Sequence, residues 1–177
     1  MLRSRRFADL LTGMRALIAF SLPWIGYRLG ARAVPLVVYL LLFGWISDYF
    51  DGVIARQSPG KETSWIGKHD LEVDIAVSGG LLIYLLAADF VSPLIASLYV
   101  LFWAFIFIVY GIGKASGSLV QAPVYGRFLW VAGHLAPQAA VWVLVWVVAN
   151  LVFTWRRFAY EVLPEFFADL GKVLRRK

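Results

Sequence analysis

Four long stretches of this chain carry almost no charge, and this feature limits the folds open to it more than any other. They are residues 33–47, 75–88, 90–113 and 128–155. A helix that crosses the hydrocarbon core of a bilayer needs about 20 mostly apolar residues, so several of these stretches are long enough or nearly so. Apolar residues make up 61% of the 177-residue chain, more than a soluble protein of this size could bury. The sequence therefore predicts an all-α integral membrane protein.

The apolar stretches predict six transmembrane helices, flanked by a short segment at each end. The spans are expected at 9–27, 33–55, 70–88, 91–112, 118–136 and 138–158. Residues 1–8 mix basic and apolar side chains and are expected to lie in the membrane interface. The tail from Arg156 to Lys177 ends in basic residues, which predicts an amphipathic surface helix for anionic lipid. Residues 1–177 are expected to form a single membrane domain.

The distribution of basic residues predicts the orientation. With six spans, 15 of the 17 lysines and arginines lie on the side of the N-terminus, whereas five spans divide them 9 to 8. Because cytoplasmic loops carry an excess of Lys and Arg, six spans with both ends in the cytoplasm are favoured. The basic residues lie at the ends of apolar segments, which suits lipid headgroups and predicts no nucleic-acid partner. The chain has no cysteine, which excludes disulfides and thiolate chemistry.

Two pairs of acidic residues are concentrated in one part of this apolar chain. Asp48 and Asp51 are three residues apart, and Asp70 and Asp74 are four apart. Either spacing places both members of a pair on one face of a helix. Asp48 and Asp51 lie near the end of the second expected span, and Asp70 and Asp74 lie at the start of the third. We therefore expect four carboxylates to converge near the cytoplasmic boundary of two antiparallel helices.

Four carboxylates at that depth would repel one another, and bound divalent cations remove the repulsion. Oxygen ligands favour Mg²⁺ or Mn²⁺, and two such ions can clamp both oxygens of a phosphoryl displacement. Gly52 and Ala55 are small and leave room for a ligand against the helix, while Arg56 suits a phosphate or diphosphate. The alternative is that these residues are solvated charges at helix ends, with Asp48 or Asp51 as a cap.

The pattern DxxDGxxAR from Asp48 to Arg56, followed by DxxxD from Asp70 to Asp74, resembles the signature of the CDP-alcohol phosphatidyltransferase family. The run DLLTGMR, which ends at Arg15, also looks like the opening of that family's first helix. The size and the number of spans agree as well. The block is one residue longer than the family's, and Gly67 is displaced. The extra residue falls in a loop, so the aspartates can still converge.

The resemblance implies an enzyme that moves the phosphatidyl group of a CDP-linked lipid, usually CDP-diacylglycerol, to an alcohol with release of CMP. It implies that two Mg²⁺ or Mn²⁺ ions are held by Asp48, Asp51, Asp70 and Asp74. Asp74 would also be the catalytic residue that takes the proton from the attacking hydroxyl. The substrate-binding residues that it implies are Gly52, Ala55, Arg56, Thr63 and Thr12.

The acceptor and the cellular setting also follow from the resemblance alone. A short chain with six spans looks most like the bacterial phosphatidylglycerophosphate synthase-like members, which favours glycerol 3-phosphate as acceptor in phospholipid biosynthesis. That likeness implies a homodimer in the bacterial inner membrane with its site at the cytoplasmic side. An inositol phosphate, serine, or CDP-choline with diacylglycerol remain alternative substrates. A cation or proton transporter that uses aspartates at the membrane boundary, and a related scaffold without activity, are further alternatives.

Overall fold

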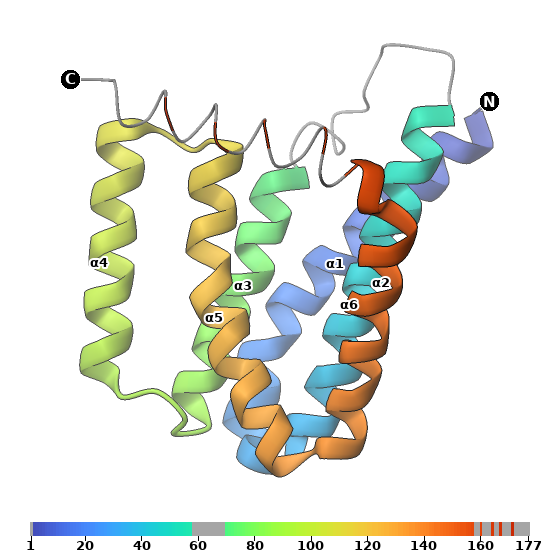
Figure 1. The fold of residues 1–177 in the computed structure, drawn as a ribbon. Helices are drawn as coiled ribbons and strands as arrows, with labels where there is room; N and C mark the ends of the chain where they lie inside the picture. The colour runs from blue at the N-terminus through green and yellow to red at the C-terminus, as the bar shows by residue number, and fades with distance from the viewer. Residues whose placement is uncertain are drawn as a thin grey trace. The chain divides into compact units, whose positions relative to one another are not determined.

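The computed structural model describes residues 2–57 and 70–157 and, in the C-terminal tail, only residues 160, 164, 167 and 171. The elements in order are α1 (Leu2–Leu29), η1 (Gly30–Ala33), α2 (Val34–Gln57), α3 (Asp70–Ala87), α4 (Pro93–Tyr110), α5 (Lys114–Leu135) and α6 (Pro137–Arg157) (Figure 1). No strand occurs among the described residues. The prediction of an all-helical chain is confirmed.

The described helices include three stretches that are long and apolar enough to cross a membrane. They are Leu10–Phe50, Pro93–Tyr110 and Pro137–Trp155. The first has 41 residues and contains most of α1 and of α2, with η1 between them. Each of the six expected spans overlaps one helix of the structure. Membrane-spanning helices are thus supported, while six crossings stay a prediction.

The predictions for the two ends of the chain are tested only in part by the described residues. Residues 1–8 were expected to lie in the membrane interface. The helix α1 begins at Leu2 and continues unbroken to Leu29, and the interfacial position of its first turns stays a prediction. The expected amphipathic tail, residues 156–177, lies mostly outside the described residues.

The chain divides into two compact units, Met1–Phe90 and Val91–Lys177, which we describe separately. The single domain over residues 1–177 stays a prediction. In the second unit, Ser92 caps α4 by accepting a hydrogen bond from the Ile95 amide, and Pro93 occupies the first turn. The Tyr99 hydroxyl donates to the Val120 carbonyl and so ties α4 to α5.

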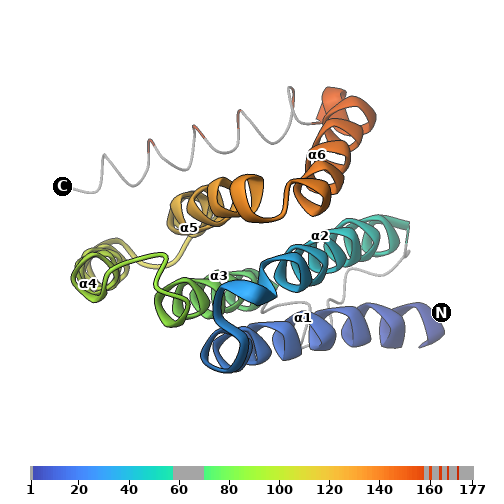
Figure 2. The ribbon, with the colours of Figure 1, turned by 90° about the horizontal axis from the view of Figure 1, so that it is seen from below.

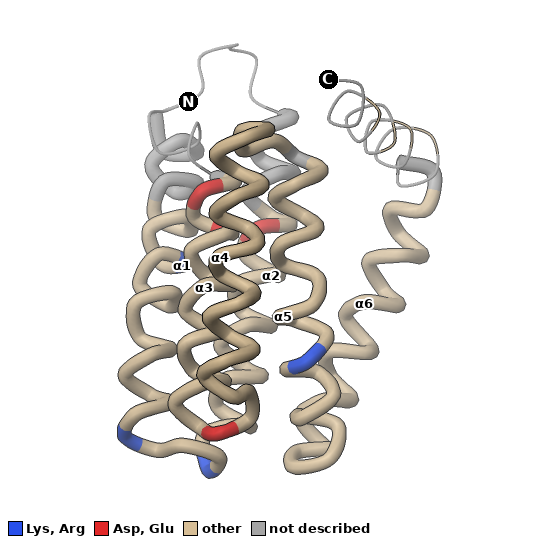
Figure 3. The backbone as a smooth tube through the Cα atoms, turned by 90° about the vertical axis from the view of Figure 1, so that its left-hand side faces the viewer, with Lys and Arg blue, Asp and Glu red and all other residues tan. Residues whose placement is uncertain are grey.

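In the first unit, α1 packs against both α2 and α3 (Figures 1 and 2). The turn at η1 makes α2 antiparallel to α1, whereas α3 runs in the same direction as α1. Leu22 and Leu81 are fully buried where these helices meet. Lys, Arg, Asp and Glu are absent from residues 16–27 of α1, 34–47 of α2 and 75–87 of α3, so the middle of the unit is apolar (Figure 3). The acids that the structure describes before Asp89 lie at one end of this apolar middle.

Two glycines allow α1 and α3 to approach closely. A Cβ atom added to Gly80 would lie 2.2 Å from the carbonyl oxygen of Ala19, and one added to Gly26 would lie 3.0 Å from the Cα atom of Tyr84. Neither position has room for a side chain. Small residues of this kind are typical of tightly packed membrane helices. The two contacts set the register between the helix that carries Arg15 and the helix that carries Asp74.

Tyr84 joins α3 to the turn between α1 and α2. Its side chain is fully buried, and its hydroxyl donates to the Gly30 carbonyl at 3.1 Å. Gly30 has a φ of 54°, a conformation that glycine adopts without strain. The bond therefore anchors a turn that few other residues could form.

We expect Tyr84→Phe to lower the free energy of unfolding by about 1 kcal/mol, because the Gly30 carbonyl loses a buried donor. This corresponds to a decrease of about 2–4 °C in the melting temperature of the protein in detergent. Tyr39→Phe is the matched control, because Tyr39 is 49% exposed on α2. Equal melting temperatures for the two variants would show that the hydroxyl of Tyr84 does not hold the turn.

Candidate functional site

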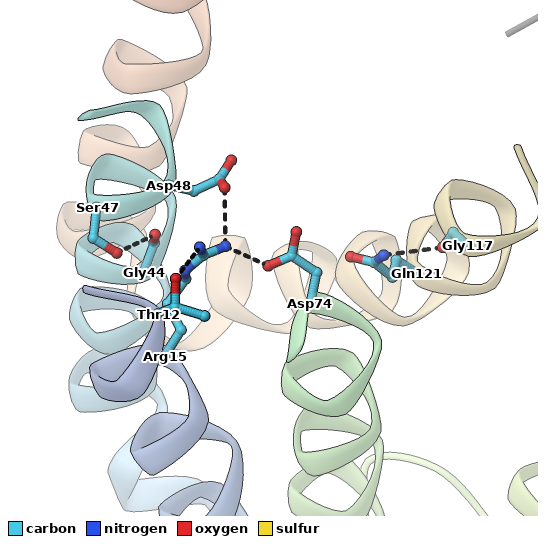
Figure 4. Close-up of polar contacts among 8 residues, drawn as sticks. All are labelled: Thr12, Arg15, Gly44, Ser47, Asp48, Asp74, Gly117 and Gln121. Carbon is cyan, nitrogen blue, oxygen red and sulfur yellow. Dashed lines mark hydrogen bonds and ion pairs between the residues drawn. The ribbon is translucent and has the colours of Figure 1, made fainter. Parts of the chain in front are cut away.

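The side chain of Arg15 connects three helices at one end of the first unit. Its Nη1 atom donates to Asp48 Oδ1 at 2.9 Å and to Asp74 Oδ1 at 2.7 Å (Figure 4). Arg15 comes from α1, Asp48 from α2 and Asp74 from α3. Both distances are typical of charge-assisted hydrogen bonds between a guanidinium and a carboxylate. One nitrogen atom thus brings together two acids that lie 26 positions apart in the sequence.

Neighbouring residues leave room for Arg15 and orient it. Thr12 precedes it by almost one helical turn, is 2% exposed, and accepts a long hydrogen bond of 3.4 Å from Nη2. On α2, a Cβ atom added to Gly44 would lie 4.0 Å from Arg15 Cγ. The aliphatic part of the Arg15 side chain therefore lies against α2 at a residue that has no side chain. The hydroxyl of Ser47, next to Asp48, donates to the Gly44 carbonyl at 2.7 Å. The arginine therefore lies in a closely fitted space between α1 and α2.

Burial differs sharply between the base and its acids. The Arg15 side chain is 3% exposed, whereas the side chains of Asp48 and Asp74 are 48% and 32% exposed. The cation is therefore enclosed by protein, while both carboxylates are also accessible from outside. A ligand that approaches the site meets the two carboxylates before it meets the guanidinium.

Only some of the predicted site residues have described side chains. The structure brings Asp48 and Asp74 together, and it buries Thr12 beside Arg15. For six others the side chains lie outside the described residues: Asp51, Gly52, Ala55 and Arg56 on the last turns of α2, Asp70 at the start of α3, and Thr63 in the sequence between these helices. Gly67 also lies outside the described residues. The backbone of α2 is helical through Gln57, so position 51 lies one turn beyond Asp48.

The described carboxylates are oxygen ligands of the kind that a divalent cation requires. Among the described side chains, no three His, Asp or Glu residues lie close enough together to hold a metal ion. The described part does supply two partly exposed carboxylates from different helices, which are the oxygen ligands that Mg²⁺ and Mn²⁺ prefer. Asp48 and Asp74 therefore fit a divalent cation as two of its ligands, and positions 51 and 70 are one turn from them on the same helices.

Arg15 is the residue whose role sequence reasoning missed. It appeared there only as the last residue of the run DLLTGMR, with no function assigned to it. A charged residue within an apolar helix is nevertheless a signal, because such residues face the bundle interior and pair with opposite charges. The spacing of Thr12 and Arg15 on one face of α1 adds to that signal.

A scan against models of protein families found no match to this chain. Searches of curated proteins and of solved structures also returned no match.

Proposed function

We propose that this chain is a metal-dependent membrane enzyme that transfers the phosphatidyl group of CDP-diacylglycerol to an alcohol and releases CMP. Glycerol 3-phosphate is the proposed acceptor, and Mg²⁺ or Mn²⁺ the proposed cofactor. In this proposal all six helices cross the membrane of a bacterial cell, and the site lies at its cytoplasmic side as part of a homodimer.

One observation carries the proposal: Asp48 and Asp74 meet at a single nitrogen of Arg15, although they come from different helices. They are the first and the last aspartate of the pattern that resembles the CDP-alcohol phosphatidyltransferase signature. Had the two acids been unrelated charges at helix ends, nothing would require them to face each other across the bundle. Their convergence is what a shared role at one phosphate would need.

The chemistry assigns a role to each described side chain. The acceptor oxygen attacks the phosphorus that carries the diacylglycerol, the bond from that phosphorus to the bridging oxygen breaks, and CMP departs with that oxygen. The partly exposed Asp74 takes the proton of the attacking hydroxyl, which makes the oxygen a better nucleophile. Mg²⁺ or Mn²⁺ bound at the aspartates would stabilise the charge on the phosphates. Arg15 holds Asp74 and Asp48 in place from the buried side.

The apolar surface of the unit suits a lipid donor. Leu17, Phe20 and Trp24 of α1 are largely exposed along the apolar middle. A CDP-linked lipid would keep its acyl chains beside such helices while its diphosphate reaches the acids at one end. The water-soluble acceptor would then enter from the side on which Asp48 and Asp74 are accessible.

The test is CMP release by the purified full chain in detergent with CDP-diacylglycerol, Mg²⁺ or Mn²⁺, and a panel of acceptors. We expect release with one acceptor, glycerol 3-phosphate, and loss of release when EDTA removes the metal. The panel includes serine and an inositol phosphate, so that a different acceptor is identified in the same experiment.

Two outcomes would contradict the proposal. Failure of the folded protein to bind CDP-diacylglycerol would exclude a transferase of this class and would favour the cation or proton transporter. Donor binding without CMP release in the presence of any acceptor would favour a related scaffold that has lost its activity.

A further inference from the structure

We propose that Arg15 is a built-in counter-cation of the site, which offsets part of the charge of Asp48 and Asp74 in the metal-free protein and weakens the binding of a divalent ion to them. The inference rests on the metal dependence of the proposed function and goes beyond it, because it assigns a role to a residue outside the signature. Arg15 acts here through the carboxylates and is a positioning residue, not a catalytic one.

The contacts support this role. A single atom, Nη1, bonds both carboxylates at 2.9 and 2.7 Å, so one positive charge is shared between two negative ones. A guanidinium cannot lose its proton under ordinary conditions, so this charge is permanent. The hydrogen bond from Nη2 to the buried Thr12 helps to keep the group directed at the acids.

The burial pattern indicates from which side a metal ion would arrive. Arg15 is 3% exposed, but Asp48 and Asp74 are 48% and 32% exposed. A divalent ion would therefore approach the carboxylates from the side opposite to the guanidinium. Both cations would then share the same two acids, and their mutual repulsion would reduce the affinity for the metal.

The position of Arg15 along α1 explains why the metal-free protein needs such a cation. Arg28 lies in the last turn of α1, at the far side of the apolar middle, and a rise of 1.5 Å per residue places Arg15 about 20 Å from it. The hydrocarbon core of a bilayer is about 30 Å thick. If Arg28 lies at one surface, Arg15 and its acids lie within the hydrocarbon depth. Two uncompensated carboxylates at that depth would be strongly unfavourable.

The test compares Arg15→Gln with the wild type in two measurements on the purified full chain after treatment with EDTA. Mn²⁺ binding is followed by electron paramagnetic resonance, and thermal unfolding is recorded with and without saturating Mn²⁺. We expect Arg15→Gln to bind Mn²⁺ about tenfold more tightly, because a repelling charge has been removed. Its metal-free melting temperature should fall by about 5 °C, and Mn²⁺ should restore most of this loss.

Arg28→Gln is the matched control. It makes the same substitution on the same helix, at a residue that is exposed and stacks on Trp24 with its guanidinium carbon 4.7 Å from the ring centroid. We expect wild-type affinity for Mn²⁺ in this variant. If Arg15→Gln does not fold, Arg15→Lys replaces it, because lysine keeps the charge but has a shorter reach. That variant should bind Mn²⁺ about threefold more tightly than the wild type.

The possible failures are distinguishable. Unchanged or weaker Mn²⁺ binding by the Arg15 variants, with normal binding by the wild type, would overturn the counter-cation role and leave the proposed function intact. If the wild type binds no Mn²⁺ at all, the metal dependence of the proposed function is wrong and the inference falls with it.

Discussion

Asp74→Asn is expected to lower CMP release from CDP-diacylglycerol by about 10³-fold while the protein remains folded. Asparagine has nearly the same shape, and its Oδ1 atom can still accept the hydrogen bond that Arg15 Nη1 donates at 2.7 Å. It cannot take a proton from the acceptor hydroxyl, however, and it is a much poorer ligand for a divalent cation. The variant therefore removes the chemistry of the site and keeps its packing.

The control for this variant is Asp89→Asn. Asp89 is exposed beyond the end of α3 and has a φ of 60°, a conformation that asparagine tolerates well. The substitution is chemically the same and should leave CMP release unchanged. If Asp74→Asn kept more than about a tenth of the wild-type rate, Asp74 would not be the general base, since such groups contribute 10²–10⁴-fold.

The helices could be predicted from the sequence because the apolar stretches are long and their ends are marked. Pro93 and Pro137, for example, stand at the starts of α4 and α6. The first span was predicted from residue 9, whereas α1 begins at Leu2, so the helix includes most of the segment that was expected in the membrane interface. The three arginines among residues 2–8 indicated a change of environment, but a change of environment does not end a helix. Backbone hydrogen bonding continues through such a segment when no proline or cap interrupts it.

The site was harder to predict than the helices, for a physical reason. The spacing of Asp48 and Asp74 within their own pairs places each acid on a helical face, but it does not reveal what lies opposite that face. Arg15 reaches both acids only because α1 packs against α2 and α3 in one particular register. That register depends on Gly80 and Gly26, whose role is visible only when Ala19 and Tyr84 are seen against them.

The close packing of α1 on α3 predicts a large loss of stability when Gly80 is replaced. Gly80→Ala should lower the free energy of unfolding by about 1–3 kcal/mol, because a methyl group there would lie 2.2 Å from the carbonyl oxygen of Ala19. The contact is with backbone, so no side-chain rotation can relieve it and the helices must move apart. Thermal unfolding in detergent measures the loss of stability, and CMP release measures the effect on the site.

Gly79→Ala is a control within the same helix turn. A Cβ atom at Gly79 would meet nothing within 4 Å, so alanine there adds only its better helix propensity and should stabilise α3 by up to about 1 kcal/mol. Opposite effects of the two substitutions on the free energy of unfolding would show that close packing, and not helix propensity, causes the loss of stability at Gly80. Gly80→Ala should also lower CMP release, because separation of α1 from α3 pulls Arg15 away from Asp74. Equal stability of the two variants would mean that α1 and α3 do not approach closely at Gly80, and the register that joins Arg15 to Asp74 would have to come from another contact.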